Sequence, residues 1–299
     1  TTKVYFNDKP LSLSKVTGEI TYKEDRFIKF NPNPNLIVNL SKRAKKLKGL
    51  IPNNFKQTKS FIAYDWAPGK TVYNYNSLKV YKKFLRFFEN ILDKSKLKII
   101  TKKAVDEFYI NKTQSRKQNF IDKYGKRYLK NKFIINGLSY DSMESILSKI
   151  DYSSLYDSST YSNFHGDLQF DNIIYNEDDD NFTYIDWRES FAGNTEEGDI
   201  YYDLSKLYGG LLISYNLMKK EDLLKYEEGE SLINFSYKEE KSLLEFKIYY
   251  ENWIQERGYD LNKIRLITAL IYLNMSALHD EKFGKILWFK SIEMFWSCK

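Results

Sequence analysis

The sequence predicts an α+β fold in which strands are concentrated near the N-terminus and helices dominate the rest of the chain. Residues 11–30 and 59–64 contain short apolar runs separated by turn residues, as strands do. Segments after residue 75 instead repeat apolar residues at helical spacing. The exception is 163–193, where two short apolar runs flank an acidic turn at 177–181 and predict a β-hairpin.

The N-terminal strands are interrupted by one predicted helix. In residues 26–30 polar and apolar side chains alternate, which indicates a half-buried strand. Residues 31–63 contain no Asp or Glu and include a cationic helix candidate at 36–47. The strand that follows ends before Pro68-Gly69, a turn signal that we take as the boundary between two parts of the chain.

Helical periodicity predicts the elements of the larger, C-terminal part. The apolar positions of residues 75–92, for instance, recur every three or four residues and are expected to face a core. The end of the chain, 280–296, is rich in aromatic side chains. The predicted helices span residues 75–92, 102–129 (with a break near 113–116), 141–150, 201–215, 239–250 and 261–278.

Composition indicates a soluble folded protein with a cationic N-terminal part. Hydrophobic residues make up 42% and charged residues 29% of the chain, which is ordinary for a globular protein. The net charge of +7 is uneven, because residues 1–63 contain 13 Lys or Arg against 4 Asp or Glu. Such a field attracts nucleotide phosphates, an acidic substrate or nucleic acid, although a solvated basic face is an equally good interpretation.

The chain shows no feature of a membrane or secreted protein. Its longest apolar stretch, 266–278, is shorter than the roughly 18 residues that a membrane span requires, and no signal peptide opens it. The single cysteine, Cys298, excludes an internal disulfide, fits a cytoplasmic protein and, with only 2 histidines, argues against zinc. The start at Thr1 rather than Met suggests trimming or a longer chain, from which an N-terminal partner domain would be missing.

Three oxygen-bearing side chains are predicted to meet at one end of the hairpin. Asp167 lies on the loop before the first strand, Asn172 at its entry, and Asp186 at the exit of the second strand. A site that transfers a phosphoryl group needs a carboxylate to accept a hydroxyl proton, and oxygen ligands that hold magnesium against the nucleotide phosphates. Asp167 is therefore the candidate catalytic residue, and Asn172 and Asp186 are the candidate magnesium ligands.

Three motifs, taken together, resemble the aminoglycoside phosphotransferase and choline kinase family. They are residues 61–71 (FIAYDWAPGKT), the HGD, Asn and IDW set of the hairpin, and residues 198–207 (GDIYYDLSKL). The resemblance implies a bilobal protein-kinase-like fold, with a small, β-rich, nucleotide-covering lobe over 1–63, a hinge at 64–70, and a large, mainly helical, catalytic and acceptor-binding lobe over 71–299. It also implies an enzyme that uses ATP and magnesium to phosphorylate a hydroxyl of a small-molecule alcohol.

The resemblance also assigns roles to single residues. Gly18 would lie in the nucleotide-covering loop, where backbone N–H groups can approach a phosphate, although a lone glycine equally fits a simple turn. Lys29 matches the lysine that binds the α- and β-phosphates. His165 would be scaffolding for the catalytic loop, and Asp203 would brace that loop through hydrogen bonds. The connector whose backbone would hold the adenine edge consists of Tyr64, Asp65, Trp66 and Ala67.

The sequence departs from the family pattern at the partner of Lys29. The family lysine pairs with a glutamate on the following helix, and this chain has none there. Lys29 is therefore expected to pair with Asp186 or with an early carboxylate such as Glu19 or Glu24, or else the lobe is arranged differently. The cations of the helix at 36–47 either contact phosphates or, as we expect for most of them, form a solvated face. They include Arg43, Lys45 and Lys46.

No motif specifies the acceptor. Arg188 and Glu189 directly follow Asp186, and they either face the acceptor pocket or form an exposed salt-bridging pair. In the first case Glu189 would attract an amine or a sugar hydroxyl. The expected acceptor is an amino alcohol of the choline or ethanolamine type or a sugar, such as a precursor of a surface polysaccharide.

Three alternatives remain open at the level of sequence. An antibiotic phosphotransferase of the aminoglycoside type would need an acidic pocket, to which Glu196, Glu197 and Asp280 could contribute. A non-catalytic kinase-like binding module would explain the missing helix glutamate and the single-glycine loop, but the intact catalytic set weighs against it. Nucleic-acid binding through the lysines of 42–48 lacks any recognised module and is not expected.

Overall fold

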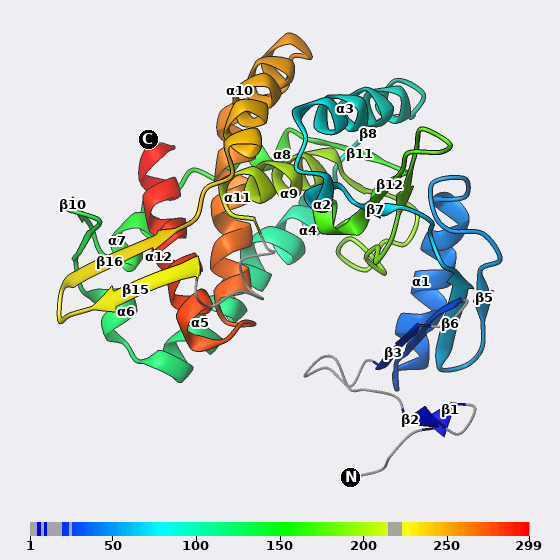
Figure 1. Ribbon diagram of the computed structural model, residues 1–299. Helices are drawn as coiled ribbons and strands as arrows, with labels where there is room; N and C mark the ends of the chain where they lie inside the picture. Colours follow the sequence, from blue (N-terminus) through cyan, green and yellow to red (C-terminus); the bar gives the residue numbers. More distant parts are fainter. Residues whose placement is uncertain (1–4, 7–8, 11–19, 24–25, 215–222, 299) are drawn as a thin grey trace.

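A four-stranded antiparallel sheet covered by one helix forms the N-terminal lobe (Figure 1). In this computed structural model the described residues are 5–6, 9–10, 20–23, 26–214 and 223–298. The strands of the sheet, in spatial order, are β3 (Ile20–Lys23), β4 (Arg26–Phe30), β6 (Phe61–Asp65) and β5 (Lys56–Gln57). Nearer the N-terminus, two short strands pair with each other, β1 (Tyr5–Phe6) and β2 (Lys9–Pro10).

Helix α1 (Pro34–Lys46) supplies the apolar side of this lobe. Asn33 caps its first turn by accepting a backbone hydrogen bond, and the proline at its first position has the backbone angle that a helix needs. The buried cluster between helix and sheet consists of Ile37, Leu40, Ala44, Leu47, Ile62, Tyr64 and Trp187. Trp187 belongs to the other lobe and directly follows Asp186, so its packing holds Asp186 against the N-terminal lobe.

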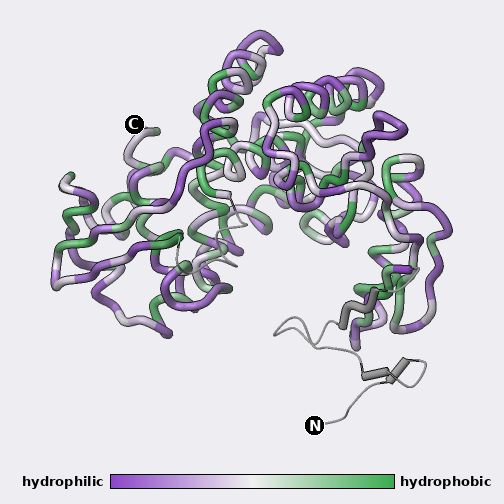
Figure 2. Tube along the Cα trace, viewed as in Figure 1, coloured by the Kyte–Doolittle hydropathy of each residue, from purple (hydrophilic) through white to green (hydrophobic). Residues whose placement is uncertain are grey.

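The C-terminal lobe is built around α11 (Leu261–Ser276), which packs against α9 (Ile200–Leu212), α5 (Lys112–Tyr124) and α12 (Glu281–Ser297). Of the 16 residues of α11, 12 are buried, as expected of a central helix. Figure 2 shows hydrophobic and hydrophilic residues alternating along the outer helices, which have one apolar face. The other helices are α2 (Val72–Tyr75), α3 (Leu78–Asp93), α4 (Lys102–Val105), α6 (Arg127–Lys130), α7 (Met143–Ser148), α8 (Ser153–Tyr156) and α10 (Lys241–Glu256).

Three small sheets complete this lobe. The first joins the predicted hairpin, β12 (Ile173–Asn176) and β13 (Asn181–Tyr184), to β7 (Lys70–Thr71), which directly follows the connector between the lobes. Gly69 has φ 108°, and a Cβ there would lie 2.1 Å from the carbonyl oxygen of Tyr175, so only glycine lets the connector approach the hairpin. The other strands are β8 (Lys98–Ile99), β9 (Phe133–Ile135), β10 (Leu138–Tyr140), β11 (Ser159–Tyr161), β14 (Gly198–Asp199), β15 (Leu224–Glu228) and β16 (Leu232–Tyr237).

The structure differs from the predicted elements in the helix at 102–129 and in sheets that the sequence did not predict, one of them of order β14-β11-β8. The break expected near 113–116 is wrong, because α5 runs through these residues and the irregular segment is a π-helical turn, Asp106–Asn111. The wider turn shifts the helical phase, so that the consecutive residues Phe108 and Tyr109 are both buried. The sheet of order β10-β9-β16-β15 was not predicted. Among the described residues, no helix has both the length and the apolar character needed to cross a bilayer.

Candidate active site

The catalytic loop and the hairpin bring the three predicted oxygen ligands to one site. A single 3-10 turn, Phe170–Asn172, leads into β12, and Asp186 follows the end of β13. The N–H of Ile185 donates to the carbonyl of Asn172 over 3.0 Å, which joins the two ends of the hairpin. The side-chain Nδ2 of Asn172 donates to the carbonyl oxygen of Asp167 at 2.8 Å and to its Oδ2 at 3.2 Å. The structure therefore brings Asp167, Asn172 and Asp186 together.

The imidazole of His165 links the two loops that carry the aspartates. Its Nδ1 accepts a hydrogen bond from the N–H of Asp167 over 3.1 Å, and its Nε2 lies 3.0 Å from the carbonyl oxygen of Ile185, to which it donates. Burial lowers the pKa of His165 to about 4. The ring is therefore neutral near pH 7, and its two contacts are those of a scaffold.

Asp203 braces the catalytic loop from within α9. It is fully buried, and its Oδ2 accepts hydrogen bonds from the hydroxyl of Tyr161 at 2.6 Å and from the N–H of His165 at 2.7 Å. Its Oδ1 accepts from the N–H of Gly166 at 2.8 Å. Burial raises the pKa of Asp203 to about 6, while these hydrogen bonds oppose the rise. Gly166 has φ 80°, and a Cβ there would lie 2.5 Å from the Cβ of Arg188, so the loop requires glycine.

Arg43 of α1 reaches into the same loop region. It is fully buried and donates hydrogen bonds to the backbone carbonyls of Ser162 at 3.0 Å, Thr195 at 3.2 Å, Glu196 at 3.0 Å, and also Phe164. Both interpretations offered for Arg43, a phosphate contact or a solvated face, are therefore wrong. Its neighbours on the helix, Lys42, Lys45 and Lys46, are exposed, as expected for most of these cations.

Lys29 pairs with Asp186 across the two lobes. Its Nζ lies 2.8 Å from Oδ1 of Asp186, and its side chain, near the end of β4, is almost buried. Of the partners predicted for Lys29, the structure shows Asp186. This carboxylate neutralises the lysine in the absence of a helix glutamate. A small cavity beside the pair is lined by Lys29, Leu40, Ile62, Tyr64, Asp186 and Trp187. Gly18, Glu19 and Glu24 lie outside the described residues.

The connector residues adopt different environments. The ring of Tyr64 is buried, stacked on Phe27 at a centroid distance of 4.7 Å and tilted against Trp187 at 5.6 Å. The N–H of Asp65 donates to the carbonyl of Asn53 over 3.0 Å, so this N–H is already used within the chain. The indole of Trp66 is 46% exposed and Ala67 is buried. Any adenine contact from this connector would therefore come from backbone groups other than the N–H of Asp65.

Lys206 is a site residue that the sequence-based predictions missed. Its Nζ lies 2.6 Å from Oδ1 of Asp167, and its side chain is only 7% exposed. Burial by itself raises the pKa of Asp167, but the charge and hydrogen bond of Lys206 outweigh this and leave the pKa below its ordinary value. The signal was available, because Lys206 lies in the same motif as Asp203, one helical turn further along α9.

Replacing Lys206 by methionine is expected to raise the pKa of Asp167 by about 1 to 3 units, because the ammonium that favours the ionised carboxylate is lost. The carboxylate of the unmodified chain therefore stays ionised at lower pH than that of the variant. An NMR titration of the Asp167 carboxyl carbon measures the change, and Lys206→Arg should reverse part of it. A pKa of Asp167 that is the same in Lys206→Met would show that the ion pair does not control the ionisation of this carboxylate.

Arg188 and Glu189 lie next to the catalytic loop. The N–H of Arg188 donates to the carbonyl of His165 over 2.8 Å, and its guanidinium carbon lies 5.3 Å from the centre of the Phe108 ring. Both side chains are partly exposed. Within the described part of the chain no ion pair joins Arg188 to Glu189, so the alternative of a mutual salt bridge is wrong.

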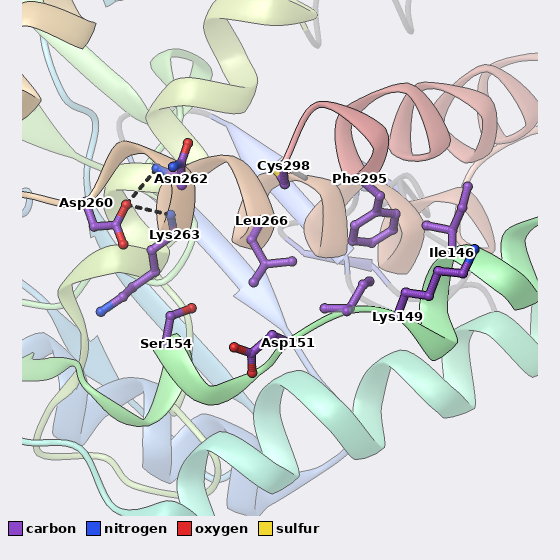
Figure 3. A pocket seen from close by; sticks show the side chains of 11 residues that line it. Ile146, Lys149, Asp151, Ser154, Asp260, Asn262, Lys263, Leu266, Phe295 and Cys298 are labelled. Carbon is purple, nitrogen blue, oxygen red and sulfur yellow. Dashed lines mark hydrogen bonds between the residues drawn. The ribbon is translucent and has the colours of Figure 1, made fainter. Parts of the chain in front are cut away.

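A larger cavity, of about 270 Å³, lies elsewhere in the C-terminal lobe (Figure 3). It is formed by residues of α7, α8, α11 and α12 and includes none of the catalytic set. Asp260, which lines it, caps α11 by accepting hydrogen bonds from the N–H groups of Asn262 at 2.8 Å and Lys263 at 3.2 Å. This carboxylate therefore stabilises the N-terminus of α11. The cavity itself is separate from the candidate active site.

Comparison with known proteins identifies the fold. No family model and no curated protein matches the sequence. A choline kinase from Cryptosporidium parvum superposes with a TM-score of 0.51 at 11% identity, over 96% of this chain and 88% of that one. An ethanolamine kinase of Plasmodium vivax gives 0.49 at 14% identity, over 97% and 84%, and a glucosamine kinase gives 0.45 at 8% identity, over 99% and 80%.

The first of these similarities establishes the fold as that of choline kinase-like small-molecule kinases, a protein-kinase-like architecture. The predicted resemblance and the predicted α+β fold class are thereby confirmed. At 11% identity the similarity concerns the fold alone. The chemistry has to be argued from the residues of the site.

Proposed function

We propose that this chain is an ATP- and magnesium-dependent kinase that transfers the terminal phosphate of the nucleotide to a hydroxyl of a small molecule. The observation that carries the proposal is the convergence of Asp167, Asn172 and Asp186 at the mouth of one hairpin, with Lys29 paired to Asp186. These are the residue types and positions that phosphoryl transfer requires. The acceptor is a small-molecule alcohol, for which the sequence offers amino alcohols of the choline or ethanolamine type and sugars, including precursors of surface polysaccharides, as candidate classes.

The donor atoms of the site fit magnesium. Asp186 offers a carboxylate, and the amide nitrogen of Asn172 is turned toward Asp167, so that the amide oxygen is its remaining donor. Carboxylate and amide oxygens are the hard ligands that magnesium prefers. When bound there, the metal would neutralise charge on the nucleotide phosphates. Lys29 would add a positive charge near the same phosphates.

Asp167 has the properties of a base that positions the acceptor. Its carboxylate is ionised near neutral pH and is held by Lys206 on Oδ1 and Asn172 on Oδ2. In the proposed reaction the acceptor hydroxyl forms the new oxygen–phosphorus bond, the bond from phosphorus to ADP breaks, and the hydroxyl proton passes to Asp167. His165, Asp203 and Gly166 would act by keeping the loop in place.

The alternatives receive less support. The missing helix glutamate, which suggested a non-catalytic binding module, is compensated by the pairing of Lys29 with Asp186. An aminoglycoside kinase would need free carboxylates, but Glu196 pairs with Lys46 at 2.5 Å and Glu197 with Lys98 at 2.9 Å. The third candidate carboxylate, Asp280, caps α12.

The proposal is tested by Mg-ATP binding and by product formation. Mg-ATP is expected to raise the melting temperature in a concentration-dependent manner, because a ligand that binds only the folded state stabilises it. ATP without magnesium should stabilise the protein less. Incubation with Mg-ATP and a panel of alcohols should give a phosphorylated product detectable by mass spectrometry. If Mg-ATP neither stabilises the protein nor reacts with any alcohol, the non-catalytic alternative is favoured.

A further inference from the structure

Two further cations lie beside Asp167 and share one aromatic ring. Lys112 is the first residue of α5, and its Nζ lies 4.2 Å from the centre of the Phe108 ring. The guanidinium carbon of Arg188 lies 5.3 Å from the centre of the same ring. The Cβ of Arg188 packs against Gly166, the residue before Asp167. The charge of Asp167 is also among those that raise the pKa of Arg188 against the effect of burial, so the guanidinium lies near the proposed base.

The aromatic floor beneath these cations comes from two helices. Tyr202 lies one turn before Lys206 on α9, and its ring meets Phe108 edge-on at a centroid distance of 4.9 Å. The Nζ of Lys112 lies 5.7 Å from the centre of the Tyr202 ring. Phe108 belongs to the π-helical turn Asp106–Asn111, and such turns occur frequently at functional sites. An apolar floor of this kind excludes water and strengthens the interaction of the cations above it with an anion.

Neither cation forms a direct ion pair with a carboxylate among the described residues. Burial opposes the charge of Arg188, but Tyr202, Glu189, Asp167 and Asp203 outweigh it and raise its pKa above the ordinary value. Burial holds the pKa of Lys112 well below its ordinary value, and the positive charges of neighbouring groups, Arg188 first among them, lower it further. Lys206 and Arg116 also contribute to this repulsion, whereas Glu189 opposes it. Holding like charges together is unfavourable, and a bound anion would relieve that cost.

We propose, building on the kinase function proposed above, that the acceptor is an anionic hydroxyl compound whose carboxylate or phosphate is held by Lys112 and Arg188 while its hydroxyl lies at Asp167. Guanidinium and ammonium groups bind both kinds of anion through charge-assisted hydrogen bonds. An acceptor with a quaternary or primary ammonium would instead meet repulsion from both side chains. The site thus selects against choline, ethanolamine and amino sugars and in favour of sugar acids, hydroxy acids or phosphorylated alcohols.

The test compares acceptors that share a skeleton and differ in charge. Binding to the full chain saturated with Mg-ADP is measured by calorimetry, and turnover with Mg-ATP is measured in parallel. One set consists of glucuronate, glucose and glucosamine, and the other consists of glycerate, glycerol phosphate, glycerol and ethanolamine. Anionic members are expected to bind and react better than the neutral and cationic members of each set. Comparing the binding and turnover of glycerate with those of glycerol phosphate shows whether a carboxylate or a phosphate is the preferred anion.

Two variants test whether Lys112 and Arg188 cause the preference for anionic acceptors. Lys112→Gln and Arg188→Gln are each expected to weaken binding of the preferred anionic probe by about 10- to 100-fold. Both should narrow the difference between anionic and neutral probes, which a general loss of folding would not do. Lys117→Gln is the matched control, because Lys117 lies on the same helix but contacts Gln114 at the exposed surface. Binding of Mg-ADP to each variant shows that it is folded.

The outcomes separate this inference from the function on which it rests. Failure of the unmodified chain to bind Mg-ADP or Mg-ATP overturns the kinase function itself. Normal nucleotide binding with uptake of ethanolamine or glucosamine in preference to the anions overturns only the anionic acceptor. Nucleotide binding with no detectable affinity for any anionic probe, or with anion affinity unchanged in the Lys112→Gln, Arg188→Gln double variant, also overturns it.

Discussion

Replacing Asp167 by asparagine is expected to lower kcat by about 10²- to 10⁴-fold while Mg-ATP still stabilises the protein. Asparagine keeps the shape of the side chain but cannot take the acceptor's proton. The nucleotide side of the site depends on other residues, namely Lys29, Asn172 and Asp186. The measurement is initial rates of phosphorylated product for the best acceptor of the panel, together with the melting temperature at increasing Mg-ATP.

This variant needs two controls. Lys206 is almost buried and loses its partner when the carboxylate is removed, which by itself destabilises the fold. A double variant, Asp167→Asn with Lys206→Met, removes both charges and should be equally inactive but better folded. Asp178→Asn, in the exposed turn of the hairpin, should keep full activity. Turnover by Asp167→Asn close to that of the unmodified protein would contradict the assignment of the base.

The sequence predicts which side chains meet at the hairpin because the geometry there is local. Asp167, Asn172 and Asp186 lie on one loop and one hairpin, whose two strands pair with each other on either side of the predicted acidic turn. The motif around Asp203 likewise fixes a helix whose start and contacts follow from neighbouring residues. In both cases short-range spacing determines which side chains meet, so a pattern in the sequence is sufficient.

The parts that the sequence does not predict depend on contacts between distant segments. The cationic sequence of α1 predicts a solvated helix face. No local sequence pattern shows that Arg43, alone among these cations, is buried against backbone carbonyls more than 100 residues away. Lys112 and Phe108 likewise meet Arg188 only in the folded chain. The sheet containing β9 and β16 was missed because its strands are short and one pairing is parallel across about 100 residues.

The class of acceptor is another feature that local patterns in the sequence do not predict. The sequence analysis considered Glu189 as a group that would attract an amine, and it placed the excess of positive charge in the N-terminal part of the chain. The folded chain adds Lys112 of α5 and Lys206 of α9 to Arg188, so cations that no local pattern indicated lie near Asp167, which the anionic acceptor proposed above would use. Substrate class therefore depends on which side chains tertiary packing collects there.

Arg43→Met is expected to lower the free energy of unfolding by about 3 to 5 kcal/mol, as the loss of one partner of a buried charged network does. The guanidinium satisfies backbone carbonyls on both sides of the catalytic loop, those of Ser162 and Phe164 before it and of Thr195 and Glu196 after it. Methionine fills similar volume but leaves these acceptors without donors. Arg43→Lys should recover only part of the loss, because one ammonium cannot reproduce the planar fork.

Because Arg43 belongs to α1, its loss should also loosen the contact between the lobes and lower activity in the fraction that remains folded. Urea unfolding followed by tryptophan fluorescence measures the free energy of unfolding. The kcat of the folded variant at low temperature measures the loss of activity. Lys45→Met, on the exposed face of the same helix, should change the free energy of unfolding by less than about 0.5 kcal/mol. If Arg43→Met were as stable as Lys45→Met, the buried guanidinium would not be what holds the catalytic loop against α1.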